Sequence, residues 1–118
     1  MSSNDTYLAV FTGTQARREA WQAKPEAERK AAEQKGKAAW GEWMNKHGDA
    51  VVAGGGPLRK TKRISRDGIA DVRNELAAFL VVRAASHEAA AKMFEGHPHF
   101  TIFPGEAVEV MPVLPVPA

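Results

Sequence analysis

Apolar residues gather into four short runs along the chain, and each run has the length and spacing of a β-strand. The runs cover residues 7–11, 50–53, 77–84 and 107–111. The first and third are apolar on both faces, which is typical of strands in the middle of a sheet. The last alternates valines with a glutamate, so it predicts a strand with one face toward a core and one toward water.

A long helix is predicted between the first two strands. Residues 25–47 are mostly strong helix formers, Pro25 suits a first helical position, and Gly48 offers the left-handed residue that ends many helices. Four large side chains recur along it at helical spacing, those of Trp40, Trp43, Met44 and His47. Such a stripe predicts that the helix lies against the sheet.

A shorter helix is predicted before the last strand. It begins at a Ser86 cap and continues to Glu95, with Gly96 as its stop. Residues 15–24, which carry Trp21, are interpreted as a polar connection between the first strand and the long helix.

The segment between the second and third strands is rich in glycine and then in basic residues. Residues 54–57 are interpreted as a bend at a strand end, because they lack the Lys-Ser/Thr ending of a phosphate-binding loop. Residues 58–75 carry an Asp67-Gly68 turn signal and leave two alternatives, a hairpin arm and a long exposed connection. The basic cluster at 59–66 has no aromatic side chain to stack on bases, so we expect a solvated arm rather than a nucleic-acid site.

The order of elements, βαββαβ, predicts an α+β fold of ferredoxin-like type with an antiparallel sheet. Both helices would cover one face, and residues 79–82 are too apolar for the other face to meet water. A second copy is the simplest cover, so we expect a homodimer in the form of a dimeric α+β barrel. We expect residues 1–118 to form one domain, with a core over about 6–113, a polar N-terminal tail and a proline-rich C-terminal tail.

The amino-acid composition limits the kinds of catalysis, metal binding and partner that this chain can have. The 118 residues include no cysteine, which excludes disulfides, thiolate catalysis and Cys-ligated metal sites. The 16 Lys and Arg against 14 Asp and Glu give a net charge of +2, which demands no polyanionic partner. No apolar stretch is long enough for a signal peptide or a membrane span, so we expect a cytoplasmic protein with no membrane partner.

Two histidines in three residues form the most unusual local sequence. In an extended segment His97 and His99 would point the same way and could bind a metal or transfer a proton, and Pro98 favours extended backbone at His97. The structural alternative places His97 at a helix end and packs His99 in a turn, and we favour it.

A second candidate site combines the aromatic stripe with the residues that follow it. Trp40, Trp43 and His47 could line one wall of a ligand pocket, and Asp49 follows two residues later as a candidate acid or base. The alternative, which we favour for Trp40 and Trp43, is that this spacing reflects packing of the helix against the sheet.

The order of these elements resembles the YCII-related family of the dimeric α+β barrel superfamily. The resemblance is carried by Trp43-Met44 followed by Gly48, residues 51–58, residues 79–82, Ser86, residues 89–91 and His97-Pro98. It implies a subunit whose sheet packs against that of a partner, enclosing a small cavity that relatives use as an enzymatic or ligand pocket.

The chain departs from that family at two motifs. Members often carry a His shortly after the first strand, paired with an Asp for acid–base work, but residues 12–24 contain no His. The Asp-Gly-Pro-Phe motif of a related subgroup is also absent, because Asp67-Gly68 continues to Ile69-Ala70. The family's catalytic dyad therefore does not carry over to this chain.

These features predict a YCII-related protein that binds a small molecule in a dimer-associated pocket. Acid–base chemistry would fall to His97, His99 and Asp49, and ligand contacts to Trp40, Trp43 and His47. The alternative is a non-enzymatic ligand-binding or regulatory module. The sequence leaves open whether the protein is an enzyme, predicts no metal site and identifies no cofactor.

Overall fold

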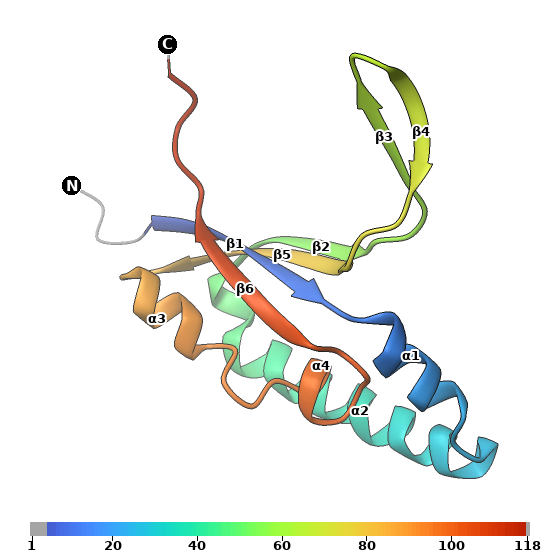
Figure 1. Ribbon diagram of the computed structural model, residues 1–118. Coiled ribbons are helices and arrows are strands. Elements are labelled where there is room, and N and C mark those ends of the chain that lie inside the picture. Colours follow the sequence, from blue (N-terminus) through green and yellow to red (C-terminus); the bar gives the residue numbers. More distant parts are fainter. Residues whose placement is uncertain (1–4, 118) are drawn as a thin grey trace.

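A four-stranded antiparallel sheet forms the middle of the molecule in a computed structural model that describes residues 5–117 (Figure 1). Its strands lie in the order β2-β5-β1-β6. Their bounds are β1 (Asp5–Thr12), β2 (Val51–Pro57), β5 (Leu76–Ala84) and β6 (Ala107–Pro112). Each of the four apolar runs forms a strand, and the two that are apolar on both faces occupy the middle of the sheet as predicted.

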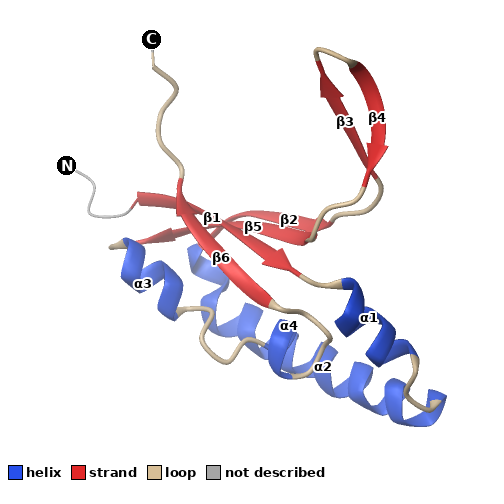
Figure 2. Cartoon of the chain, in the orientation of Figure 1, coloured by secondary structure: helices blue, strands red, loops and turns tan. Residues whose placement is uncertain are grey.

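Helices cover one face of this sheet (Figure 2). The long helix α2 (Glu26–His47) and the shorter α3 (His87–Lys92) confirm the two predicted helices. Ser86 caps α3 by accepting a hydrogen bond from the Ala89 N–H at 3.0 Å, although α3 ends before Glu95. The βαββαβ order is therefore confirmed, and the fold is a ferredoxin-like α+β fold.

Three short elements differ from the sequence expectations. Residues 15–24 contain a helix, α1 (Gln15–Gln22), because the Thr14 hydroxyl caps it by accepting from the Arg17 N–H at 3.2 Å. Gly48 is right-handed, with φ −56°, and continues from α2 into a 3-10 turn, Gly48–Ala50. The short helix α4 (Pro98–Thr101) replaces the extended segment predicted around Pro98.

The hydrophobic core lies between the sheet and the helices. Alternate residues of β1, namely Tyr7, Ala9 and Phe11, face the helices and are almost fully buried. Their neighbours on β5, Leu80 and Val82, point the same way. From the helices, Trp43, Ala90 and Phe94 complete this core.

The glycine run lies within β2 and does not form the predicted bend at the end of a strand. Gly55 has φ +56°, and a Cβ built on it would lie 2.0 Å from the backbone oxygen of Phe79 on the neighbouring strand. Only glycine fits this left-handed, closely approached position. The register of the β2–β5 pair is irregular on both sides of Ala53, which accommodates the run.

A separate hairpin, β3 (Thr61–Ser65) and β4 (Gly68–Val72), resolves the ambiguity of residues 58–75. Gly68 has φ +106° and follows the tight turn that the Asp67-Gly68 signal predicts. The hairpin rises from the side of the sheet that carries no helices, as does the C-terminal tail (Figure 1). The radius of gyration, 16.4 Å, exceeds the value of about 13.5 Å for a compact chain of this length, as these projecting segments require.

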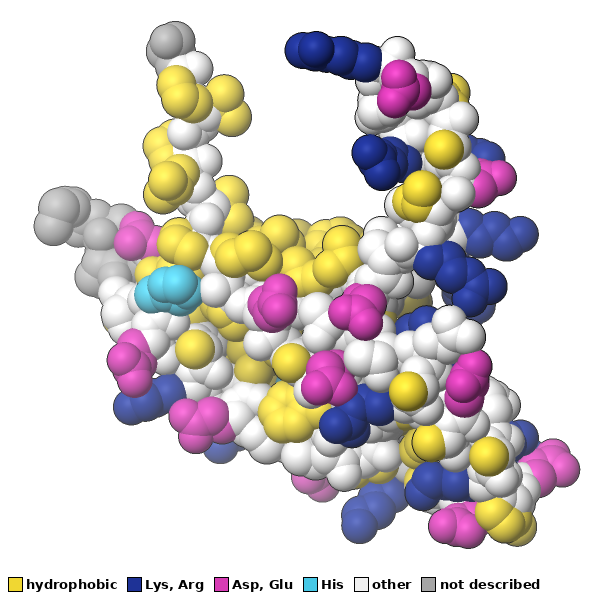
Figure 3. All heavy atoms as spheres, viewed as in Figure 1, with side chains coloured by type: hydrophobic (Ala, Val, Ile, Leu, Met, Phe, Trp, Pro, Cys, Tyr) yellow, Lys and Arg dark blue, Asp and Glu magenta, His cyan; other side chains and the backbone are white. Residues whose placement is uncertain are grey.

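The face of the sheet opposite the helices is apolar and uncovered. On this face Leu8 lies beside Val81, and Val10 lies beside Phe79. Along each strand these residues alternate with the ones that face the core. Val10 is only 8% exposed because its neighbours crowd it, but the other three are partly exposed, and Met111 beside Leu8 is 41% exposed. Hydrophobic side chains cover this surface between the hairpin and the tail (Figure 3).

No helix within residues 5–117 has the length and apolar character needed to cross a membrane. The predicted polar N-terminal tail begins with residues 1–4, which lie outside the described residues.

Candidate functional site

Both histidines of the predicted pair lie inside the molecule, where α4 packs beneath the sheet. His97 is 1% exposed and His99 is 8% exposed. His97 has extended backbone, as the following proline requires, and caps α4: its Nδ1 accepts a hydrogen bond from the His99 N–H at 3.0 Å. The two rings both contact Phe11, with centroid distances of 5.2 and 5.1 Å. Although the segment after His97 is helical, the fold still brings the two imidazoles together.

Aromatic rings surround His97. The centroid of its ring lies 4.5 Å from that of Trp40 and 5.0 Å from that of Trp43, with Phe94 at 5.9 Å. Because Nδ1 accepts a hydrogen bond, the neutral ring carries its proton on Nε2. Among the described residues, Nε2 has no hydrogen-bond partner. His97 therefore presents a buried N–H donor to aromatic rings instead of to an oxygen acceptor.

Burial keeps the His97 ring uncharged. Loss of hydration, followed by charge repulsion from the neighbouring His99 and His47, lowers its pKa from 6.5 to about 4. The hydrogen bond from the His99 N–H acts in the same direction, because a proton on Nδ1 would displace it. At neutral pH His97 is a neutral packing residue and helix cap in this subunit.

His99 is held by the end of β1. Its Nε2–H donates to the backbone oxygen of Thr12 at 2.8 Å, and its ring packs so closely on Gly105 that a Cβ there would lie 2.2 Å from it. Burial lowers its pKa, while the bond to Thr12 raises it. His99 is therefore a buried packing residue, as the structural alternative expects, but it lies in α4 rather than in a turn.

The predicted ligand-binding residues join the same aromatic cluster. Trp43 is 8% exposed and its indole N–H donates to the backbone oxygen of Met93 at 2.7 Å, while Trp40 stacks on Phe11 at 5.5 Å. His47 is partly buried against Trp43, at 4.8 Å, and burial followed by the charge of Lys46 lowers its pKa. Asp49 is exposed in the 3-10 turn.

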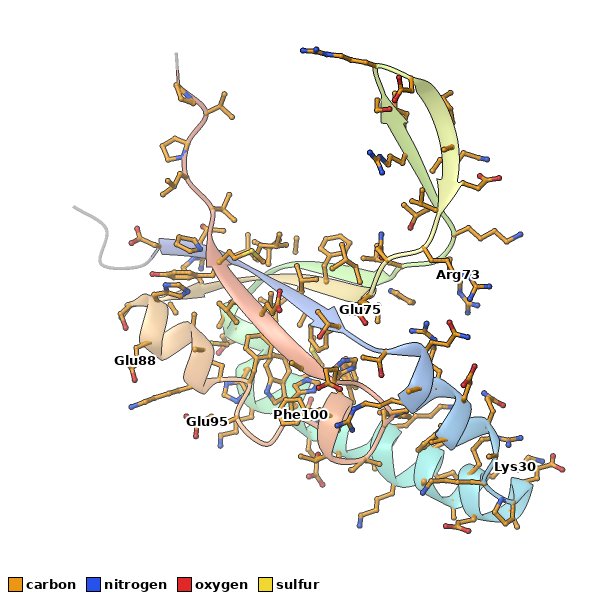
Figure 4. The ribbon with its side chains drawn as sticks, viewed as in Figure 1. Lys30, Arg73, Glu75, Glu88, Glu95 and Phe100 are labelled. Atoms are coloured by element: carbon orange, nitrogen blue, oxygen red, sulfur yellow. The ribbon has the colours of Figure 1, made fainter. Side chains whose placement is uncertain are left out.

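Sequence reasoning did not foresee a cleft at the foot of the hairpin. It has a volume of about 1140 Å³ and is open to solvent. Five cationic side chains line it, those of Arg18, Arg59, Lys60, Lys62 and Arg73. Arg73 lies where the hairpin meets the sheet (Figure 4). The basic run at 59–66 was the visible signal, but it could not reveal that α1 and the end of β4 contribute to the same cleft.

A smaller cleft of about 260 Å³ lies between the end of α3 and β6, lined in part by Phe94, Glu95, Phe100 and Glu106. None of the six predicted site residues lines either of these two clefts. Glu106 is ion-paired with Arg17 at the edge of this region.

The fold and the site together define a ferredoxin-like α+β protein with a histidine-containing aromatic core and an open basic cleft. No family model matches the chain, and no curated protein is similar to it in sequence.

A solved structure does share the fold. It is that of the 5-chloro-2-hydroxyhydroquinone dehydrochlorinase of Burkholderia phenoliruptrix AC1100 in complex with 2,5-dihydroxybenzoquinone. The two chains are 14% identical, the match covers 89% of each, and the TM-score is 0.53. At this identity the similarity establishes the fold, and membership of the YCII-related family remains a prediction.

Proposed function

We propose that this chain is a homodimeric, YCII-related protein that binds a small molecule in a pocket beside the dimer interface. The observation that carries the proposal is the uncovered apolar face of the sheet. The 14%-identical enzyme that shares the fold was solved with a small quinone, which is consistent with a small-molecule role. A cytoplasmic location stays a prediction.

The uncovered face supports a second copy as its cover. Partly exposed Leu8, Phe79 and Val81 form a continuous apolar strip across the two central strands. Exposed apolar surface of this kind is costly in water and is relieved by burial against a similar surface. A two-fold axis through the strip would place the strip of one subunit against the same strip of its partner.

The hairpin and the tail support the same arrangement. Ile64 and Ile69 lie directly opposite each other on the hairpin and are 73% and 71% exposed. In the tail, Leu114 is 76% exposed. Both segments project from the uncovered side of the sheet (Figure 3), where a second subunit would bury these side chains.

Light scattering tests the dimer directly. The wild-type protein is expected to show twice the 12.8 kDa mass of the chain at micromolar concentration. Val81→Glu places a charge on the uncovered strip and should give the monomer mass with an unchanged circular dichroism spectrum. Ala38→Glu adds the same charge on the exposed side of α2 and should leave the dimer intact. A monomeric wild-type protein would refute the dimer and the pocket beside it.

A second candidate function is acid–base catalysis by His97 and His99. The observation that favours it is the buried His97 Nε2–H, which no acceptor satisfies among the described residues and which a substrate atom would satisfy. Asp49 is exposed, and within residues 5–117 no hydrogen bond or salt bridge joins it to either imidazole, so it is not part of this candidate.

A substrate screen tests this candidate. The screen uses quinones and small molecules that carry an acidic C–H bond. If the His97 ring transfers a proton, any activity found should fall at least 100-fold in His97→Asn. His87→Asn, at an exposed site on α3, is the matched control and should keep full activity. Activity that survives in His97→Asn would exclude His97 as the proton-transferring group, and a screen that finds no activity would favour the non-enzymatic binding module.

A further inference from the structure

The basic cleft is built from segments that lie far apart in the sequence. Residues 58–62 contribute from the start of the hairpin, residues 71–74 from its end, and Arg18 from α1. Ala77, which also lines the cleft, precedes Phe79 by two residues on the same face of β5, so the cleft opens beside the uncovered apolar strip. This position suits a pocket that a dimer would border.

Positive charge in the cleft is largely uncompensated. Asp71 is the one carboxylate among the lining residues, and its oxygen pairs with Lys62 Nζ at 2.8 Å. Within residues 5–117, the other four cations of the cleft, those of Arg18, Arg59, Lys60 and Arg73, have no ion-pair partner. Like charges around one hollow repel each other, and an anion bound among them relieves that repulsion.

Apolar side chains line the same hollow. Leu58 is 40% exposed and Leu76 is 46% exposed, and Val72 and Ala77 extend this surface. Thr61 and Asn74 add neutral polar groups, joined by a hydrogen bond of 3.1 Å. Cationic groups beside an apolar surface match a ligand that has an anionic head and an apolar body. Arginine guanidinium groups bind carboxylate and phosphate heads through paired hydrogen bonds.

We propose that this cleft binds a small organic anion, a carboxylate or phosphate attached to an apolar body, through Arg18 and Arg73. The proposal rests on the proposed small-molecule function and specifies its ligand class and its location. The volume of about 1140 Å³ exceeds that of typical small-molecule pockets, about 300–1,000 Å³, because the hollow is open to solvent, and a ring with its substituents would fill only part of it.

Calorimetric titration of the full chain with four probes tests the ligand class. The probes are benzoate, phenyl phosphate, inorganic phosphate and uncharged benzyl alcohol. The two organic anions are expected to bind at least tenfold more tightly than benzyl alcohol or inorganic phosphate, with affinity falling as salt is raised from about 0.01 to 0.15 M. Comparison of benzoate with phenyl phosphate identifies which anionic head the cleft prefers.

Variants locate the binding. Arg73→Gln and Arg18→Gln should each weaken the tighter organic anion about tenfold, which is typical for loss of a charge-assisted hydrogen bond. Arg66→Gln makes the same change at the exposed tip of the same hairpin, outside the cleft, and should alter affinity less than twofold. Circular dichroism checks that each variant is folded.

Four results would overturn the anion site. The first is equal binding of benzyl alcohol, which would leave a small-molecule pocket without anion selectivity. The second is equal weakening by Arg66→Gln and Arg73→Gln, which would indicate a diffuse charge effect. The third is absence of anion binding. The fourth is tighter, salt-dependent binding of a single-stranded oligonucleotide, titrated as a further probe. The proposed dimer is measured separately by light scattering, so its failure is distinguishable from failure of this site.

Discussion

Replacing Trp43 by alanine is expected to lower the free energy of unfolding by about 3–5 kcal/mol. The indole is 8% exposed, stacks on Phe94 at a centroid distance of 5.1 Å and contacts the His97 ring. Removing it leaves a cavity between α2 and the sheet that these rigid rings cannot fill. Chemical denaturation followed by circular dichroism measures the loss.

Trp43→Phe separates the contribution of ring packing to stability from the contribution of the indole hydrogen bond. Phenylalanine keeps most of the contact area but leaves the Met93 oxygen, which now accepts from the indole at 2.7 Å, without that donor. The expected cost is about 1–2 kcal/mol. If Trp43→Ala cost under about 1 kcal/mol, Trp43 would not be a core residue and its role as a ligand contact would regain support.

Acidification should destabilise the protein through His97. Its pKa is about 4 in the folded chain and about 6.5 in an unfolded one. Between these values the unfolded chain binds more protons, so a falling pH favours unfolding. The effect begins near pH 6.5, grows down to about pH 4 and reaches at most about 3 kcal/mol. Denaturation midpoints measured from pH 7.5 to 4 test this dependence.

His97→Asn isolates the contribution of this ring. Asparagine is a good helix cap, so its side-chain oxygen can replace Nδ1 in accepting from the His99 N–H, but it does not titrate in this range. The variant should be less stable at pH 7 because of the lost ring and should lose less stability on acidification. An NMR titration that placed the His97 pKa near 6.5 would contradict the buried neutral ring.

The sequence predicted the sheet well because its strands carry a strong local signal. Residues 77–84 are apolar on both faces, and this is the property that central strands need. The short helices escaped prediction for a physical reason. Four residues of α4 are too few for helical periodicity, and the helix is fixed by the His97 cap and by Pro98 at the first helical position.

The sequence singled out two separate groups of candidate residues and did not predict that they meet. His97, His99, Trp40, Trp43 and His47 do gather in one cluster, because α2 and α4 pack on the same face of the sheet. Their burial depends on contacts with Phe11 and Gly105, which local patterns do not reveal. The basic cleft was missed because it joins Arg18 to residues at least 40 positions away.

The hairpin forms its own two-stranded sheet, and this makes its length independent of the rest of the fold. Among the described residues β3 and β4 pair only with each other, so two residues added to each arm would extend the hairpin without shifting any contact in the larger sheet. One residue inserted into β1 would instead turn its alternate side chains from the core to the opposite face. Evolution can therefore vary the reach of the hairpin through insertions and deletions while the β1 register stays fixed.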